Sequence, residues 1–287
     1  ERLSDIILWW VHNRTRSDGQ YGGGWGDDCE MWRVWVPVLL GFDDPEIVAA
    51  QARFSRALLS QPHMEGGYTN KMSDVEHTAE DSADVLTPMM HLEPENPEWR
   101  DRALRLVDLF ENKWSGRNAR GGLQFKSIYF TSERVEESAY RAFDTVYHPR
   151  AMQPGLLYWQ RTGDSRLTAL FGAWMDTWVE ATARAEDGKP AGIVPVGIHW
   201  PDGTLTDGEG PWWNSQYLEE NPLYRWPTAM DLQLNTLLLA HLMTGEKRYL
   251  EPIRSMAEIR LRHLKNGGGQ ESEPGSEAWC AEQLGLL

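Results

Sequence analysis

Apolar residues recur every three or four positions along most of the chain, which is the spacing of one face of a helix. The clearest stretches are 97–114 and 165–178. The same spacing predicts further helices at 3–13, 28–40, 45–60, 74–91, 147–160, 226–243, 248–264 and 276–286. We therefore predict an all-α protein.

The predicted helices are of two kinds. One kind is amphipathic and follows a short acidic turn, as at 42–46, 94–98, 162–166 and 244–248. The other kind is apolar on most sides, as at 232–243, which indicates burial. Alternation of the two kinds is an irregular internal repeat, in which a polar outer helix pairs with an apolar inner helix.

The connections between these helices are unequal in length. Links from inner to outer helices are short, whereas links from outer to inner helices are long; these are 14–26, 61–73, 115–145, 185–225 and 265–275. In a ring of alternating helices, all long links emerge on one face, where function concentrates. Segment 123–131 is expected to add a short β-strand or hairpin to that face.

This pattern resembles the (α/α) toroid of many carbohydrate-active enzymes. They include unsaturated glucuronyl and rhamnogalacturonyl hydrolases, some cellulases and several polysaccharide lyases. The residue-level match is the motif GGGWGDD at 22–28. The resemblance implies about five to six helix pairs in a single catalytic domain over 1–287, which can be part of a longer protein. A protein-binding solenoid is the alternative, but its connections are usually short on both faces.

Net charge limits the possible partners. The chain has 43 acidic and 28 basic residues and a net charge of −15, which argues against nucleic acid or an anionic membrane as partner. No apolar run approaches the roughly 20 residues that span a bilayer, so membrane insertion is not expected. A carbohydrate partner remains, and a few local arginines would suffice to bind an acidic one.

The N-terminal residue and the two cysteines bear on where in the cell the protein is located. The chain starts at Glu1, so we expect a processed or trimmed N-terminus, and a periplasmic or extracellular location is favoured. Cys29 and Cys280 fit no zinc-ligand spacing, and buried free thiols are expected rather than a bridge.

The glycine-rich motif supplies candidate acids. Asp27 and Asp28 lie where a helix begins, beside Trp25, and either N-cap the helix or take part in catalysis. Glycoside hydrolysis needs two carboxyl groups, roughly 5 Å apart for retention and about 6.5–9.5 Å apart for inversion. Neighbouring residues point in different directions, so the predicted acid/base pair is Asp28 with Asp144.

Two further interpretations concern the same acids. Glu80 and Asp81 are the next candidates for the second carboxyl group. Asp27, Asp28 and Glu30 form a possible Ca²⁺ ligand set, but we expect no metal and no other cofactor.

A second set of candidate catalytic residues lies at 144–150. Tyr147, His148 and Arg150 resemble the residues of toroidal lyases, in which Tyr or His removes a proton from a uronate and a cation neutralises its carboxylate. The structural alternative is a Tyr and a His hydrogen-bonded into helix ends.

The longest loop is rich in aromatic residues that suit sugar stacking. The predicted substrate-binding residues there are His199, Trp200, Trp212 and Trp213, with Tyr217 and Trp226 beside them. Trp25, Asp27, His77 and Arg150 are predicted to bind substrate from other segments. The alternative for the loop tryptophans is packing of the loop on itself.

The leading hypothesis is thus a glycoside hydrolase that cleaves a uronate-containing or plant-type saccharide by carboxylate acid/base catalysis. A polysaccharide lyase that uses Tyr147 and His148 is the second hypothesis, and a sugar epimerase is the third. A non-catalytic carbohydrate-binding module needs the aromatic residues but not the paired acids.

Overall fold

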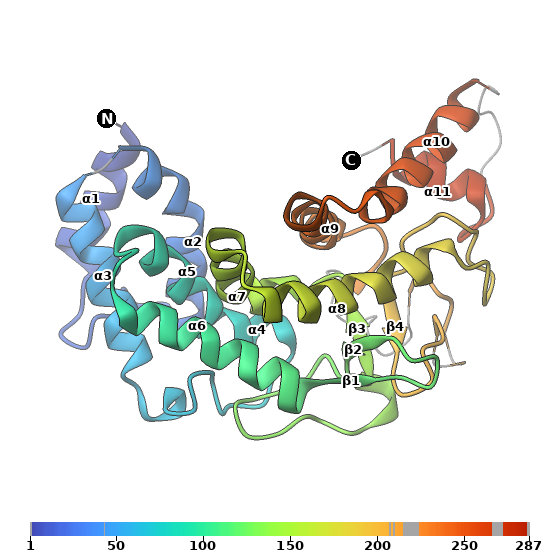
Figure 1. Ribbon diagram of the computed structural model, residues 1–287. Coiled ribbons are helices and arrows are strands. Elements are labelled where there is room, and N and C mark those ends of the chain that lie inside the picture. The colour runs from blue at the N-terminus through green and yellow to red at the C-terminus, as the bar shows by residue number, and fades with distance from the viewer. Residues whose placement is uncertain are drawn as a thin grey trace. The chain divides into compact units, whose positions relative to one another are not determined.

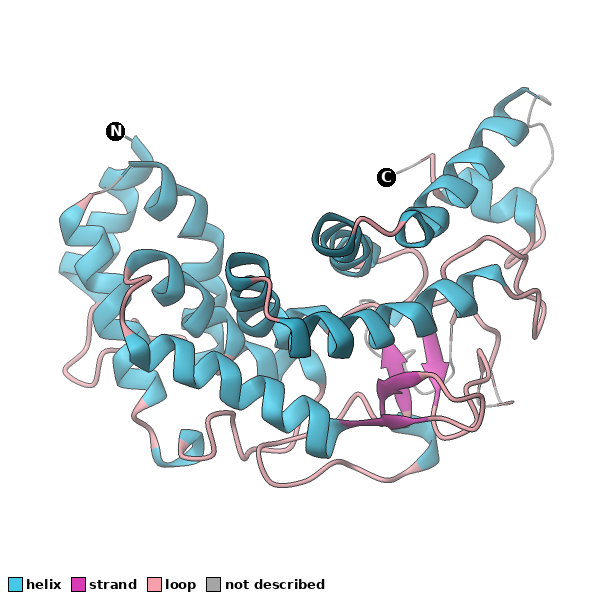
Figure 2. Ribbon diagram, viewed as in Figure 1, coloured by secondary structure: helices cyan, strands magenta, loops and turns pink. Residues whose placement is uncertain are grey.

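A computed structural model describes residues 2–42, 44–206, 208, 210–214, 224–265 and 272–285. The chain is mostly helical and has two small antiparallel sheets, as Figure 2 shows. The predicted all-α class is confirmed, whereas the closed toroid stays a prediction.

The chain forms two compact units. The first unit comprises Glu1–Leu109, Tyr129–Arg134 and Arg150–Tyr158; the second comprises Phe110–Ile128, Val135–Pro149 and Trp159–Leu287. Asp28 belongs to the first unit and Asp144 to the second.

The first unit is helical (Figure 1). Its elements are α1 (Arg2–Arg14), α2 (Trp25–Phe42), α3 (Pro45–Leu59), η1 (Pro62–Met64), α4 (Val75–Glu80), α5 (Ala83–Leu92) and α6 (Pro97–Leu109). Helix α2 packs against α1, α3, α4 and α5, while α6 packs against α5. Helix α5 is buried along most of its length, whereas α3 and α6 bury one face and expose the other. The predicted distinction between apolar and amphipathic helices is therefore present in this unit.

Two helices of the first unit, α3 and α4, begin at an aspartate that caps the helix. The Asp44 carboxylate accepts hydrogen bonds from the amides of Glu46 and Ile47 at the start of α3. The Asp74 carboxylate accepts from the amide of His77 at the start of α4. These caps explain why both helices begin close to where the sequence predicts.

The single helix predicted at 74–91 is wrong, because the chain breaks between α4 and α5. Ser82 leaves the helical conformation (φ −124°, ψ −77°), and its hydroxyl accepts a hydrogen bond from the amide of Thr69. This contact with the preceding loop replaces a helical one. The break separates α4 from α5, and each of the two helices carries acids that lie near Arg150.

The second unit combines a β-region with three long helices and the short helix α11. Its strands are β1 (Ser115–Arg117), β2 (Leu123–Phe125), β3 (Phe143–Thr145) and β4 (Gly197–His199). Its helices are α8 (Ser165–Ala183), α9 (Met230–Thr244), α10 (Glu251–Lys265) and α11 (Glu277–Gln283), with the short turns η2 (Phe110–Trp114), η3 (Ala139–Arg141) and η5 (Lys247–Leu250). Helix α7 (Pro149–Thr162) contributes residues to both units.

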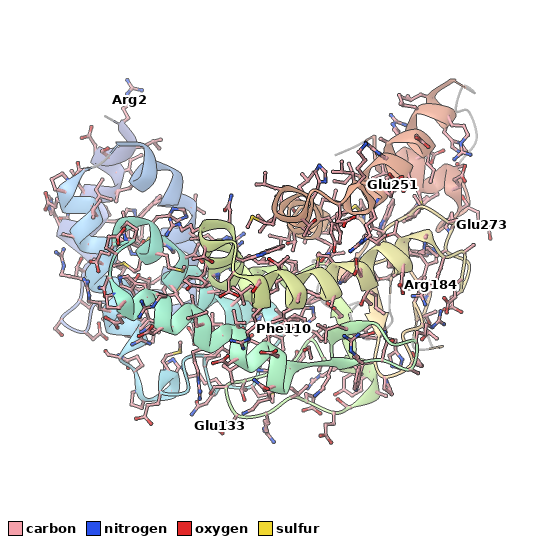
Figure 3. All side chains as sticks on the ribbon, in the orientation of Figure 1. Arg2, Phe110, Glu133, Arg184, Glu251 and Glu273 are labelled. Carbon is pink, nitrogen blue, oxygen red and sulfur yellow. The ribbon has the colours of Figure 1, made fainter. Side chains whose placement is uncertain are left out.

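Segment 123–131, which was predicted to add a short strand or hairpin, contains the short strand Leu123–Phe125. Strand β1 pairs with β2, and β3 pairs with β4, both antiparallel. Phe110, labelled in Figure 3, packs against Phe125 and Trp174 at ring distances of 4.7 and 5.2 Å. This aromatic core joins η2, β2 and α8 around the carboxylate of Asp144.

Two expectations from composition are also answered. Cys29 and Cys280 are buried free thiols, as expected. Among the described residues, no helix has both the length and the hydropathy that crossing a bilayer requires.

Candidate functional site

Asp28 holds the glycine-rich loop against the start of α2. It is buried, and its carboxylate accepts hydrogen bonds from the amides of Tyr21 (2.6 Å) and Gly23 (3.1 Å). Gly22 and Gly24 have φ of 121° and 89°, a conformation that side chains other than glycine rarely adopt. The loop is therefore shaped by its glycines and fixed by Asp28, which is the structural alternative considered for this residue.

A cavity of about 780 Å³ opens between this loop, the end of α1 and the start of α2. Its lining includes Trp10, Arg14, Arg16, Tyr21, Asp27 and Asp28. The Asp27 side chain is exposed there. Trp25 is half-buried and packs against Phe54 at 5.7 Å between ring centroids.

A second feature of the first unit is a group of acids around a buried arginine. Arg150, at the start of α7, is 1% exposed and binds Asp84 with two nitrogens, Nη2 at 2.6 Å and Nε at 3.1 Å from Oδ2. Three more carboxylates lie within 4 Å of its guanidinium: Glu30 on α2 (3.4 Å) and Glu76 and Glu80 on α4 (3.8 and 3.9 Å). We call these five residues the Arg150 cluster.

The Arg150 cluster runs from the interior of the first unit to its surface. Side-chain exposure rises from 2% at Asp84 to 9% at Glu80, 18% at Glu76 and 48% at Glu30. Gly26 lies one turn before Glu30, and a Cβ at this position would meet Oε2 of Glu80 at 2.9 Å. Solvent therefore reaches the cluster at Glu30, while the missing side chain at Gly26 lets α2 approach Glu80 closely.

Glu80 has an unusual proton affinity. Burial raises its pKa, the positive charge of Arg150 lowers it, and the negative charges of Glu30 and Glu76 raise it again, with a resulting pKa of about 7. Near neutral pH, Glu80 is therefore about half protonated. A carboxyl group with a raised pKa beside further carboxyl groups is the usual composition of an acid/base site.

The spacing of the acids is also informative. Glu30, Glu76 and Glu80 each bring an oxygen within 4.8 Å of the others. Such a set can serve as an acid/base group or as oxygen ligands of a hard cation. The positive charge of Arg150 among these oxygens disfavours a second cation. The set Asp27, Asp28 and Glu30 does not meet this spacing within the described part of the chain.

His77 lies beside the cluster on α4. Its Nδ1 is 2.8 Å from the carboxylate of Asp74, and its side chain is 58% exposed. Burial lowers the His77 pKa, but the hydrogen bond and charge of Asp74 outweigh this effect, so the net shift is upward. His77 is thus available at the surface next to Glu76, as a substrate-binding role requires.

Asp144, in β3 of the second unit, is enclosed. It has no exposed surface, and its Oδ2 accepts hydrogen bonds from Nε1 of Trp174 (2.7 Å) and the amide of Phe125 (3.2 Å). Burial raises its pKa to about 7, although both hydrogen bonds lower it. A carboxyl group with no exposed surface cannot touch a glycosidic oxygen in this conformation, so we assign Asp144 a structural role.

His148 and Tyr147 are buried in the second unit. Nδ1 of His148 accepts from the amide of Thr145 at 2.8 Å, and Nε2 lies 3.0 Å from the carbonyl of Ser127. Burial lowers the His148 pKa to about 4, so the ring is neutral at physiological pH. Tyr147 packs edge-on against Tyr224, with ring centroids 6.0 Å apart. His148 therefore has the geometry of a hydrogen-bonded residue at a helix end, while Tyr147 is packed against an aromatic ring.

The aromatic residues of the long loop are mostly packed. Trp212 is 2% exposed against Trp226, while Trp213 packs against Trp279. Tyr217 lies outside the described residues.

His199 and Trp200 lie in the same unit near the strands. Nδ1 of His199 is 3.1 Å from the carboxylate of Asp202. Trp200 is half-buried, and Nζ of Lys126 lies 5.9 Å from its ring. The described part of the loop thus shows packing for Trp212 and leaves Trp200 the more accessible of the two.

Sequence reasoning missed part of the Arg150 cluster. It named Glu80 as a reserve candidate and Arg150 as a substrate-binding cation, but it gave Glu76 and Asp84 no role. The signal was present, because residues 76, 80 and 84 are acids at intervals of four. Comparisons with protein-family models, curated proteins and solved structures found no match for this chain.

Proposed function

We propose that this protein is a glycoside hydrolase that cleaves a uronate-containing or plant-type saccharide, with the Arg150 cluster as its acid/base centre. The observation that carries the proposal is Glu80. It is a buried carboxyl group with a pKa of about 7, and the carboxylates of Glu30 and Glu76 lie within 4.8 Å.

Glu80 acts as the general acid in this mechanism. It gives its proton to the glycosidic oxygen while the bond to the anomeric carbon breaks. Glu30 is the most exposed acid of the cluster and attacks the anomeric carbon, forming a glycosyl–enzyme ester. Water then cleaves this ester after losing a proton to Glu80. The nearest oxygens of Glu30, Glu76 and Glu80 lie within 4.8 Å of one another, below the roughly 6.5–9.5 Å of inverting enzymes, so retention of configuration is expected.

Arg150 positions the acids rather than touching the substrate. Asp84 binds the guanidinium at the buried end of the cluster. The same guanidinium lies within 4 Å of Glu30, Glu76 and Glu80. The fixed positive charge at this place attracts the carboxylates of the cluster, while burial raises the pKa of Glu80 and keeps its proton in place. Arg150 therefore positions both the proposed acid, Glu80, and the proposed nucleophile, Glu30.

The lyase hypothesis receives less support. Elimination at a uronate needs an accessible base, and His148 has no exposed surface. It also needs a cation for the substrate carboxylate, and Arg150 already binds Asp84 with two nitrogens. We keep elimination as an outcome of the test below.

The test is a polysaccharide screen with two readouts, reducing ends and ultraviolet absorbance of unsaturated uronate. Reducing ends without absorbance are expected. Glu80→Gln should lower kcat about 10²–10⁴-fold, the usual contribution of acid/base catalysis. The matched control is Glu95→Gln, which removes one exposed carboxylate of the same unit outside the cluster and should keep wild-type turnover.

The nucleophile has a sharper test. Glu30→Ala removes an exposed side chain, so the fold should persist while turnover is lost. Added azide should restore turnover and yield a glycosyl azide, because the anion enters the space of the missing carboxylate. Ultraviolet-absorbing products would support elimination instead. Saccharide binding with no turnover of any substrate would indicate a binding module, and wild-type turnover by Glu80→Gln would also contradict the proposal.

A further inference from the structure

The cavity beside the glycine-rich loop is distinct from the Arg150 cluster, although both use the first turns of α2. Gly26 and Glu30 lie one turn apart on the side of α2 that faces α4. Asp27 and Met31, also one turn apart, line the cavity. Two neighbouring stripes of the same helix thus border the acid cluster and the cavity.

We propose that this cavity binds the anionic group of an acidic sugar through Arg14 and Arg16. The inference rests on the proposed function, because it names the substrate class of the same unit. The volume of about 780 Å³ lies within the roughly 300–1,000 Å³ typical of small-molecule sites.

The two arginines have no carboxylate partner among the described residues, in contrast to several others of this unit. Arg56 pairs with Glu93, Arg102 with Glu98 and Arg150 with Asp84. Arg14 and Arg16 form no such pair within that part of the chain, although Asp27 and Asp28 line the same cavity. Their guanidinium groups are free to bind an external anion.

Arg14 is held in place by aromatic rings. Its guanidinium carbon lies 5.6 Å from the ring centroid of Trp10 and 5.8 Å from that of Trp9. Cation–π contacts of this kind restrict a long side chain without consuming its hydrogen-bond donors. Arg14 can therefore present its N–H groups to a carboxylate at a reduced entropic cost.

The segment that carries Arg16 is also held in place by hydrogen bonds within the protein. The Arg16 amide donates to the carbonyl of Gln20 (2.7 Å), and the Gly19 amide donates to the carbonyl of Arg16 (3.0 Å). Gly22, whose φ of 121° suits glycine, lies against the guanidinium, because a Cβ there would be 3.4 Å from Nη2 of Arg16. Asp28 fixes the rest of the loop through Tyr21 and Gly23.

The chemistry of the lining selects an acidic sugar over a neutral one. Guanidinium groups bind carboxylates and sulfates with paired, charge-assisted hydrogen bonds. The exposed carboxylate of Asp27 can accept hydrogen bonds from sugar hydroxyls. Two local arginines offset the repulsion that a net charge of −15 exerts on an anionic ligand. A carboxylate and a sulfate share this chemistry, and the experiment separates them.

The experiment measures binding by calorimetry with the Glu80→Gln protein, so that hydrolysis does not consume the ligand. The probes are an oligogalacturonate, its methyl ester and a sulfated oligosaccharide of similar length. We expect the acid to bind more tightly than the ester. Arg14→Gln and Arg16→Gln should each weaken binding of the acid about 10–100-fold, the value of a hydrogen bond to a charged group. Binding of the ester should stay unchanged.

Arg100→Gln is the matched control, because it removes one positive charge from the same unit at an exposed position outside the cavity, where Arg100 pairs with Asp101. Equal weakening by Arg100→Gln, or equal affinity for acid and ester, would overturn the inference. Binding of the sulfated probe alone would identify sulfate as the recognised group.

The two proposals fail in different ways. Intact hydrolysis by wild-type protein with no acid preference overturns only the role of the cavity. Preferential binding of the acid with no hydrolysis of any saccharide overturns the hydrolase and leaves the cavity assigned.

Discussion

Glu80 in the first unit and Asp144 in the second have the same pKa of about 7, and burial is the main cause in both. Their surroundings differ. Asp144 has no exposed surface, and two donors, Nε1 of Trp174 and the amide of Phe125, bind its Oδ2. Glu80 lies between a buried arginine and Glu30, whose side chain is half exposed.

The difference shows that a raised pKa alone does not identify an acid catalyst. Burial raises the pKa of any carboxyl group, including one that only organises the core. A candidate site also needs a route to solvent and a second carboxylate at the right spacing. Glu80 meets both conditions, and Asp144 does not meet the first.

The largest expected effect is on the stability of the protein, which should depend on Asp144 far more than on Glu80. Asp144→Ala leaves the Trp174 and Phe125 donors buried without an acceptor, at about 1–3 kcal/mol each, so the free energy of unfolding should fall by roughly 2–6 kcal/mol. Glu80→Gln should change it little, because it removes a desolvated charge and keeps the side-chain volume. Urea unfolding of both variants measures the difference. Equal losses would mean that Glu80 is as structural as Asp144.

The pH dependence of stability gives the next test. The pKa of Asp144 rises from near 4 in the unfolded chain to about 7 in the folded one, so the folded state binds more protons between these values. Its contribution to stability therefore falls as pH rises through this range. His148 acts in the opposite sense between about pH 4 and 6.5, because its folded pKa is lowered.

Asp144→Asn removes the falling contribution and leaves that of His148. Melting temperatures measured from pH 4 to 8 should show the variant gaining stability relative to wild type as pH rises. Parallel curves for the two proteins would contradict the raised pKa of Asp144.

The same comparison shows how far the sequence could predict the fold and the site. Periodicity and short acidic turns such as 42–46 placed the helices, because these are local signals. The break at Ser82 was not predictable, since its cause is a hydrogen bond from Thr69 in another segment. The four-residue spacing of residues 76, 80 and 84 was readable, but the approach of Arg150 to them depends on tertiary packing.

The role of Asp144 could not be predicted from the sequence. Its apolar neighbours Phe143 and Val146 were compatible with a buried strand, yet acids in a loop-rich region also suit catalysis. Burial by Trp174 from α8 decides between these interpretations, and no local pattern encodes that contact. The separate units of Asp28 and Asp144 likewise could not be read from the sequence.

A smaller effect concerns the pH dependence of activity. The negative charge of Glu76 raises the pKa of Glu80, and Glu80 must be protonated to act as acid. Glu76→Gln should therefore lower this pKa and move the alkaline limb of kcat/KM to lower pH. Glu95→Gln should leave the limb in place. An unchanged limb in Glu76→Gln would show that a group other than Glu80 controls it.

The smallest effect comes from two glycines of α2, and it tests the position of Glu80 without touching an acid. Alanine is favoured over glycine by up to about 1 kcal/mol in a helix interior, and by less near the ends of α2, where Gly26 and Gly41 lie. A Cβ at Gly41 meets nothing within 4 Å, so Gly41→Ala should stabilise the protein and keep its turnover. A Cβ at Gly26 meets Oε2 of Glu80 at 2.9 Å, so the carboxyl group must move.

Gly26→Ala should therefore gain less stability than Gly41→Ala and lose turnover, with kcat affected more than KM. Thermal melts and steady-state kinetics of the two variants provide the measurement. If both variants gain stability equally and keep full turnover, the placement of Glu80 against α2 has no part in catalysis. The absence of a side chain at residue 26 would then be a matter of helix packing, because only a reacting carboxyl group makes a small displacement at this position costly for rate.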